Sequence, residues 1–147
     1  SYSYLVTNIY LNHVEDRVIP LLGDNRLTAQ EAVADRVIMG YFRKPQRFLS
    51  KALRVLKDEG GIVHYHQLTP TESIPDEPLN QFREVCTNMR KECRLENLVR
   101  VKSYAPRIVH VVRICLAQAQ ESRGLAHHDL PPGADVGGQG VILQHAP

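Results

Sequence analysis

The alternation of apolar and polar residues along the chain predicts an α/β domain. Residues 2–12 have helical spacing, and the apolar runs 17–22, 36–39 and 62–67 are short enough to be buried strands. Between the last two runs, residues 45–56 place apolar side chains on one helical face. Strand, helix and strand at this spacing are typical of a right-handed crossover between parallel strands.

The second half of the chain predicts a helix followed by two strands that pair with each other. An amphipathic helix is expected over 79–94, after a proline-containing loop over 68–78. Strands are expected over 97–103 and 108–116, with only the short segment 104–107 between them. Because so short a connection joins antiparallel neighbours, we expect parallel strands with a late antiparallel pair.

The last part of the chain has a different character. From residue 117 the apolar periodicity is lost, and the segment LPPGADVGGQG is rich in glycine and proline. We therefore expect residues 1–116 to form the folded portion and residues 117–147 to be a flexible or divergent tail.

The composition is that of one globular domain and excludes several other classes. The chain has 147 residues, of which 43% are hydrophobic and 23% charged, and its net charge is +2. This charge excludes a histone-like polycation but leaves room for a local basic patch. No apolar run approaches the roughly 18 residues of a membrane span, and no signal peptide is recognisable. The odd set of Cys86, Cys93 and Cys115 predicts free thiols in the cytoplasm.

Two short segments that follow predicted strands are candidate ligand-binding elements. Gly23, Asp24 and Asn25 follow the first strand, and Gly40 and Tyr41 follow the second. Ligands bind beyond the carboxyl ends of strands in open α/β sheets, where carboxylate and amide oxygens accept hydrogen bonds from an exocyclic amine. The alternatives are an Asx turn in the first segment and, in the second, a tyrosine that covers the core edge.

Other polar side chains near these strands are candidates for contact with a substrate or RNA. His64 and His66 share one face of a strand, and without a third ligand of suitable spacing we expect them to line a cleft and hold no metal. The basic candidates for RNA phosphates are Arg26, Arg43, Lys44 and Arg107. The alternatives are a solvated helix face for the run around residue 44 and a hairpin cap at residue 107.

Five blocks of sequence follow one another in an order that resembles a known family. They are SYSYLVTNIYLNHVEDRV, GDNR, ADRVIMGY, ALRVLKDEGGIVHYHQ and VKSYAPRIVHVV. This order is similar to the archaeal and eukaryotic tRNA enzymes that modify the guanosine 3′ of the anticodon. The resemblance implies a partial Rossmann-like class I methyltransferase fold, S-adenosylmethionine as cofactor and tRNA as partner.

One block distinguishes the two branches of this family. The guanosine N1-methyltransferases carry Asn-Leu-Pro or Asn-Pro-Pro after the second strand, where this chain has Gly40-Tyr41-Phe42. That difference favours the wybutosine-pathway aminocarboxypropyltransferases, with the guanosine methyltransferase and a non-catalytic RNA-binding remnant as alternatives. The resemblance further implies that Gly23 to Asn25 contact the adenine, and that Gly40 and Tyr41 border the methionine part and the target base.

The chain also departs from the family pattern at both ends. The family's glycine-rich loop and ribose-binding acidic residue lie upstream of residue 1, so the resemblance implies a C-terminal portion. We therefore expect weak binding of S-adenosylmethionine by this chain alone, and self-association through an exposed sheet edge. After HVV, the segment from Arg113 to Leu116 no longer follows the family.

Overall fold

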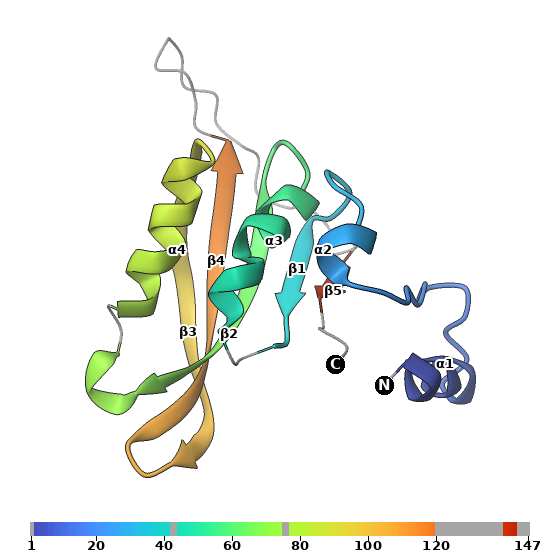
Figure 1. Cartoon of the computed structure of the whole chain (residues 1–147), viewed down its shortest axis with the longest axis horizontal. Helices are drawn as coiled ribbons and strands as arrows, with labels where there is room; N and C mark the ends of the chain where they lie inside the picture. The colour runs from blue at the N-terminus through green and yellow to red at the C-terminus, as the bar shows by residue number, and fades with distance from the viewer. Residues whose placement is uncertain (1, 42–43, 75–76, 120–139, 144–147) are drawn as a thin grey trace, which may run out of the picture.

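A five-stranded mixed sheet forms the centre of the protein, with the strand order β3-β4-β2-β1-β5. The computed structural model describes residues 2–41, 44–74, 77–119 and 140–143. The strands are β1 (Arg36–Met39), β2 (Gly61–Pro70), β3 (Lys91–Ala105), β4 (Ile108–Ala119) and β5 (Gly140–Leu143). β1 is parallel to β2 and β5, whereas β4 is antiparallel to β2 and β3 (Figure 1). The prediction of parallel strands with a late antiparallel pair is confirmed.

Helices cover one face of this sheet. The helical elements are α1 (Tyr2–Leu11), α2 (Asn25–Thr28), the 3₁₀ helix η1 (Pro45–Phe48), α3 (Leu49–Val55), the 3₁₀ helix η2 (Thr71–Ser73) and α4 (Glu77–Asn88). α4 lies in front of β3 and α3 in front of β2, whereas α1 lies apart from the sheet (Figure 1). None of the helices in the described stretches is long and apolar enough to cross a membrane.

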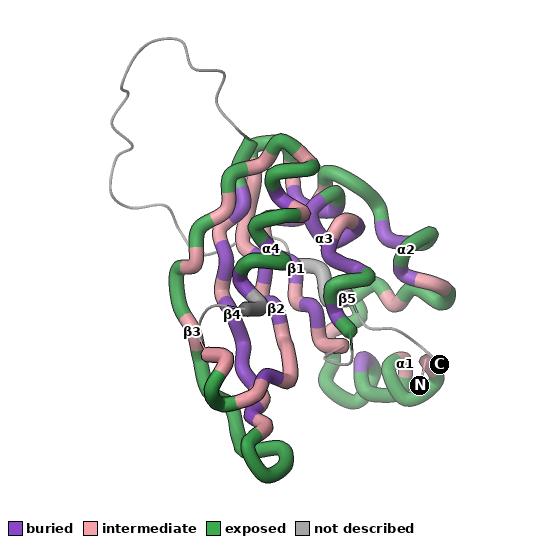
Figure 2. The backbone as a smooth tube through the Cα atoms, turned by 60° about the vertical axis from the view of Figure 1, so that its left-hand side comes forward, coloured by how far each residue is buried: buried purple, intermediate pink, exposed green. Residues whose placement is uncertain are grey.

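The core lies between the sheet and these two helices. Alternate residues of β1, β2 and β4 point inward, and Leu49, Leu53 and Phe82 from α3 and α4 pack onto them with 7% exposure or less. Figure 2 shows the buried positions concentrated along α3, β2 and β4, while α1 is mostly exposed. The predicted crossover of strand, helix and strand around residues 36–67 is therefore confirmed.

The turn before β2 requires the double glycine found there. Gly60 has a φ of +111°, and a Cβ built on it would lie 2.3 Å from the carbonyl oxygen of Ala117. A Cβ on Gly61 would lie 2.4 Å from the carbonyl oxygen of Asp35. Both glycines therefore allow the backbones of neighbouring strands to approach where β2 enters the sheet.

Three predictions of individual elements from the sequence were wrong. Residues 17–22 form no strand: Pro20 has no N–H to donate, and Ile19 and Leu22 are 84% and 69% exposed. The helix expected over 79–94 ends at Asn88, because Arg90 adopts a left-handed φ of 55° and β3 begins at Lys91. The loop expected over 68–78 is shorter, since β2 continues to Pro70 and η2 follows.

The region expected to be a tail contains strand residues. β4 continues to Ala119, and β5 pairs with β1 in parallel register from Arg36↔Gly140 to Met39↔Leu143. The remaining residues of this region, 120–139 and 144–147, lie outside the described residues, so the tail stays a prediction for them. Because β1 has a partner on each side, the unpaired edge from which we expected self-association is not at β1. Self-association itself stays a prediction.

Candidate functional site

The loop that precedes α2 is held by Gly23 and Asp24. Gly23 has a φ of +140°, and an added Cβ would lie 2.7 Å from the Thr28 methyl group. The Asp24 carboxylate caps α2 by accepting a hydrogen bond from the backbone N–H of Arg26 at 3.0 Å. The guanidinium Nε of Arg26 donates to the same carboxylate at 3.0 Å. The Asx-turn alternative therefore describes Asp24, whose oxygens are engaged within the loop.

Asn25 is the residue of this loop that offers a free acceptor. Its side chain is 8% exposed, and its Oδ1 atom is buried without a hydrogen-bond partner among the described residues. A buried amide oxygen without a donor is costly, by about 1–3 kcal/mol. A ligand that reached Asn25 would satisfy this oxygen by donating an N–H group, as the exocyclic amine of adenine can.

An aromatic contact joins this loop to the segment after β1. The Arg26 guanidinium carbon lies 5.8 Å from the centre of the Phe48 ring. The centres of the Tyr41 and Phe48 rings are 5.7 Å apart, with an angle of 83° between the ring planes. Tyr41 and Gly40 are half-buried, whereas Phe48 is 7% exposed. Two segments that the sequence placed at the same edge of the sheet are thus in contact through Phe48. The sequence predicts Phe48 on the core-facing side of the helix over 45–56, but it does not indicate this contact with Arg26 and Tyr41.

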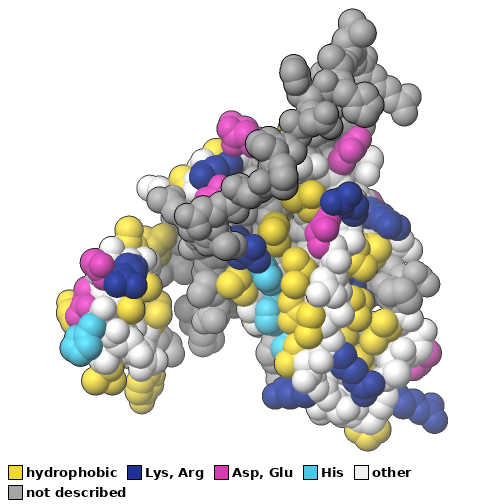
Figure 3. All heavy atoms as spheres, turned by 180° about the vertical axis from the view of Figure 1, so that it is seen from behind, with side chains coloured by type: hydrophobic (Ala, Val, Ile, Leu, Met, Phe, Trp, Pro, Cys, Tyr) yellow, Lys and Arg dark blue, Asp and Glu magenta, His cyan; other side chains and the backbone are white. Residues whose placement is uncertain are grey.

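The two predicted histidines lie on the sheet face opposite α3 and α4. The Nε2 atom of His64 lies 2.6 Å from Nη1 of Arg36, and Nδ1 of His66 lies 3.1 Å from Nε2 of His110 on β4. Figure 3 shows histidines in a row among hydrophobic side chains on this face. Burial lowers the pKa of all three histidines, and neighbouring positive charge on Arg36, Lys102 or another imidazole lowers it further. His110 completes this row, and only the β2–β4 register could have revealed it.

The predicted basic residues have different outcomes. Lys44 is exposed at the start of η1 with a left-handed φ of 64°. Arg107 is exposed at the tip of the β3–β4 hairpin with a φ of 60°. Arg43 lies outside the described residues. The structure therefore brings Arg26 to the site around Tyr41 and places Arg107 on a separate element.

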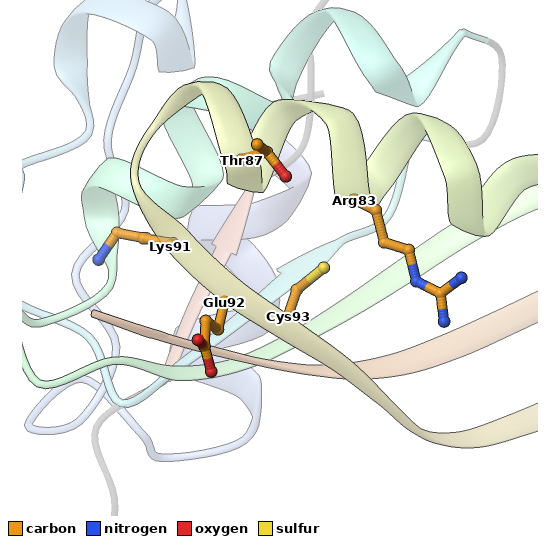
Figure 4. A pocket seen from close by; sticks show the side chains of 5 residues that line it. All are labelled: Arg83, Thr87, Lys91, Glu92 and Cys93. Atoms are coloured by element: carbon orange, nitrogen blue, oxygen red, sulfur yellow. The ribbon is translucent and has the colours of Figure 1, made fainter. Parts of the chain in front are cut away.

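A shallow hollow lies at the other end of the sheet, where β3 begins. It is lined by Arg83, Thr87, Lys91, Glu92 and Cys93, which come from α4 and β3 (Figure 4). Burial raises the pKa of the Cys93 thiol, and that of Cys115 to about 12, so neither is an activated nucleophile. The expected free thiols are confirmed for all three cysteines. Within the described stretches, no group of three or more His, Cys, Asp or Glu side chains could hold a metal ion.

Comparison with known structures identifies the class of fold. The crystal structure of TYW2 from Pyrococcus horikoshii in complex with MeSAdo matches with a TM-score of 0.76 and 37% identity, over 82% of this chain and 45% of that chain. TYW2 from Methanocaldococcus jannaschii in complex with AdoMet matches with a TM-score of 0.75 and 36% identity, over 80% of this chain and 53% of that chain. The fold is therefore that of the S-adenosylmethionine-dependent methyltransferase class.

Sequence comparison narrows this class to one family. The profile described as TRM5/TYW2 methyltransferase domain matches residues 1–96, and the chain belongs to that family. The tRNA(Phe) (4-demethylwyosine(37)-C(7)) aminocarboxypropyltransferase of Pyrococcus horikoshii is 39% identical over 112 residues, which are 76% of this chain and 40% of the relative. The chain thus spans less than half the length of that relative.

Proposed function

We propose that this chain provides part of the cofactor site and of the RNA surface of an S-adenosylmethionine-dependent tRNA aminocarboxypropyltransferase. The proposed acceptor is the wyosine-type base 3′ of the anticodon, in wybutosine synthesis. The observation that carries the proposal is the Oδ1 atom of Asn25, which is buried without a hydrogen-bond partner among the described residues. The next residue, Arg26, contacts Phe48, which in turn contacts Tyr41. The aminocarboxypropyltransferase relative and the Gly40-Tyr41 pair support this branch of the family.

The residues at the carboxyl edge of the sheet fit the adenosyl group of the cofactor and the tRNA base to which the aminocarboxypropyl group is transferred. Asn25 offers an acceptor for an amine N–H, Gly40 directly follows the end of β1, and Tyr41 offers an aromatic ring that contacts Phe48. When bound, S-adenosylmethionine supplies an electrophilic carbon next to a sulfonium sulfur. The task of Gly40 and Tyr41 is then to orient the reactants, because the carbon presented in line with the nucleophile is the one transferred.

The adenine contact can be tested by calorimetric titration with S-adenosylmethionine. Asn25→Ala should weaken binding by about tenfold, the value of one buried hydrogen bond. Because Asn25 Oδ1 is buried without a partner within the described chain, removing it costs no hydrogen bond there, and the same variant should unfold in urea at a midpoint no lower than that of the wild type. Asn80→Ala, an exposed amide on α4, is the matched control and should change neither quantity. Equal affinities of the two variants would contradict the assignment of Asn25.

The reaction type can be tested with two forms of labelled cofactor. One carries the label in the aminocarboxypropyl group and is assayed with tRNA(Phe) that has 4-demethylwyosine at the target position. The other carries the label in the methyl group and is assayed with tRNA(Phe) that has an unmodified guanosine there. Transfer of the first label supports the proposal, transfer of the second indicates the guanosine methyltransferase alternative, and binding without transfer indicates a non-catalytic remnant. Replacing Gly40-Tyr41 by Asn-Leu should shift the product towards methylation, and an unchanged product would count against the orienting role.

A further inference from the structure

The β3–β4 hairpin extends past the carboxyl ends of the parallel strands. β1 ends at Met39, opposite Tyr65, whereas the pairing of β2 with β4 continues to Pro70↔Ile108. The backbone N–H of Thr71 donates to the carbonyl oxygen of Arg107 at 2.9 Å, which fixes the hairpin tip to the end of β2. The tip therefore projects from the same edge of the sheet as Gly40 and Tyr41 (Figure 1).

The projecting part of the hairpin is positively charged and exposed. Every residue from 99 to 107 is exposed, and these residues include Arg100, Lys102 and Arg107. The sequence from residue 97 to 119 contains no aspartate or glutamate. Arg100 pairs opposite Val111 and Lys102 opposite His110, which point to opposite faces of the sheet. The tip thus presents positive charge on both of its faces.

The backbone of the turn is also unusual. Arg107 has a φ of 60°, a conformation that glycine adopts without strain and that costs other residues about 1–2 kcal/mol. An arginine at this position therefore keeps its long cationic side chain at the tip at the expense of stability. Such strain is consistent with a binding role for the residue.

Protection of an edge strand is the alternative explanation for the charges. β3 lies at one edge of the sheet, and charged side chains on an edge strand prevent pairing with other chains. That explanation accounts for Arg100 and Lys102 on β3. It does not account for Arg107, which lies in the turn outside both strands, or for the single sign of charge over the whole tip.

We infer that residues 99–107 form a basic arm that contacts the phosphate backbone of the RNA substrate bound at the carboxyl edge. The inference rests on the proposed tRNA substrate, and it assigns to the arm affinity for RNA without recognition of bases. Arg100, Lys102 and Arg107 each displace counterions from RNA phosphates when they bind. The arm holds the RNA beside the cofactor site and takes no part in binding the cofactor.

The test compares two triple variants of the full chain by fluorescence anisotropy with an unmodified tRNA(Phe) transcript at several salt concentrations. The arm variant carries Arg100→Gln, Lys102→Gln and Arg107→Gln. The control variant carries Arg83→Gln, Lys91→Gln and Arg94→Gln, which remove the same charge around the opposite end of β3. The arm variant should bind at least tenfold more weakly, and the slope of log K against log salt concentration should become shallower by about 2–3, as expected for three lost phosphate contacts.

The possible outcomes separate the arm from the proposed function. A control variant close to wild type, together with the shallower slope of the arm variant, supports the inference. Equal weakening in both variants would attribute the effect to net charge and overturn it, as would wild-type affinity and slope in the arm variant. Calorimetry with S-adenosylmethionine should give wild-type cofactor binding for the arm variant. If the wild-type chain does not bind S-adenosylmethionine but its RNA binding still depends on residues 99–107, the proposed function is contradicted. The inference that these residues contact RNA phosphates is then still supported.

Discussion

Replacing Arg113 by methionine is expected to stabilise the protein. Arg113 is 0% exposed, and its Nε and Nη2 atoms are buried without hydrogen-bond partners among the described residues. Its Nη1 atom reaches only Oε1 of Gln67, at 3.4 Å, and burial lowers its pKa. The hydroxyl groups of Tyr65 and Thr69 are also buried without partners in the described part of the chain. None of the ion pairs found there involves Arg113, so no described carboxylate compensates the guanidinium. Exchanging buried ionic groups for apolar residues of similar size stabilises proteins by about 1–4 kcal/mol.

The assay is urea and thermal unfolding followed by circular dichroism. A gain of this size corresponds to a rise in midpoint temperature of about 3–15 °C for a chain of this length. Arg113→Lys, which keeps the buried charge, should give no gain, and Arg83→Met on the exposed side of α4 should change stability by less than about 0.5 kcal/mol. A lower free energy of unfolding for Arg113→Met than for wild type would refute the reasoning, because it would mean that the guanidinium stabilises the fold.

Three further predictions concern the fold. Gly60→Ala should lower the free energy of unfolding in urea by about 1–3 kcal/mol, because of the positive φ and the contact with the Ala117 carbonyl. Burial lowers the pKa of His66 and His110, so below the usual histidine pKa of about 6.5 the unfolded chain binds more protons than the folded chain. The free energy of unfolding in urea should therefore fall from pH 7 to pH 5, and it should fall less steeply when both histidines are replaced by glutamine. Cys115, with a pKa raised to about 12, should react with a thiol reagent at pH 8 only after unfolding, as a chromogenic assay would show.

Local periodicity predicted the centre of the fold correctly, and failed where partners decide the structure. The crossover from β1 to β2 and the β3–β4 hairpin follow from apolar spacing and connection length, which are properties of the sequence. Residues 17–22 are as apolar as a strand, but no strand of the described sheet pairs with them. Residues 89–94 fit the helix period as well as the residues of α4 do. The helix nevertheless ends at Asn88, because Arg90 adopts a left-handed backbone conformation.

The candidate site was predictable in part for the same reason. The rule that ligands bind at the carboxyl edge of α/β sheets predicted that the segment Gly23–Asn25 lies near Tyr41, although the segment before Gly23 is not a strand. Phe48 and His110 escaped prediction because their roles depend on contacts between distant segments. The free oxygen of Asn25 depends on which atoms its neighbours engage, which no sequence pattern reports.

Two arginines on and next to β4 are expected to have opposite effects, Arg113 within the strand and Arg107 just before it. Along β4, period-2 alternation points Val109, Val111, Arg113 and Cys115 inward, under the helices, and each is at most 2% exposed. Arg107, just before β4, lies beyond the sheet and is exposed. A charge that water does not reach releases no counterions, so Arg113 adds nothing to RNA affinity while it destabilises the fold. Arg113→Met should therefore raise stability and leave the salt dependence of tRNA binding unchanged, whereas Arg107→Gln should make that dependence shallower; a shallower slope for Arg113→Met would show that its guanidinium reaches the RNA.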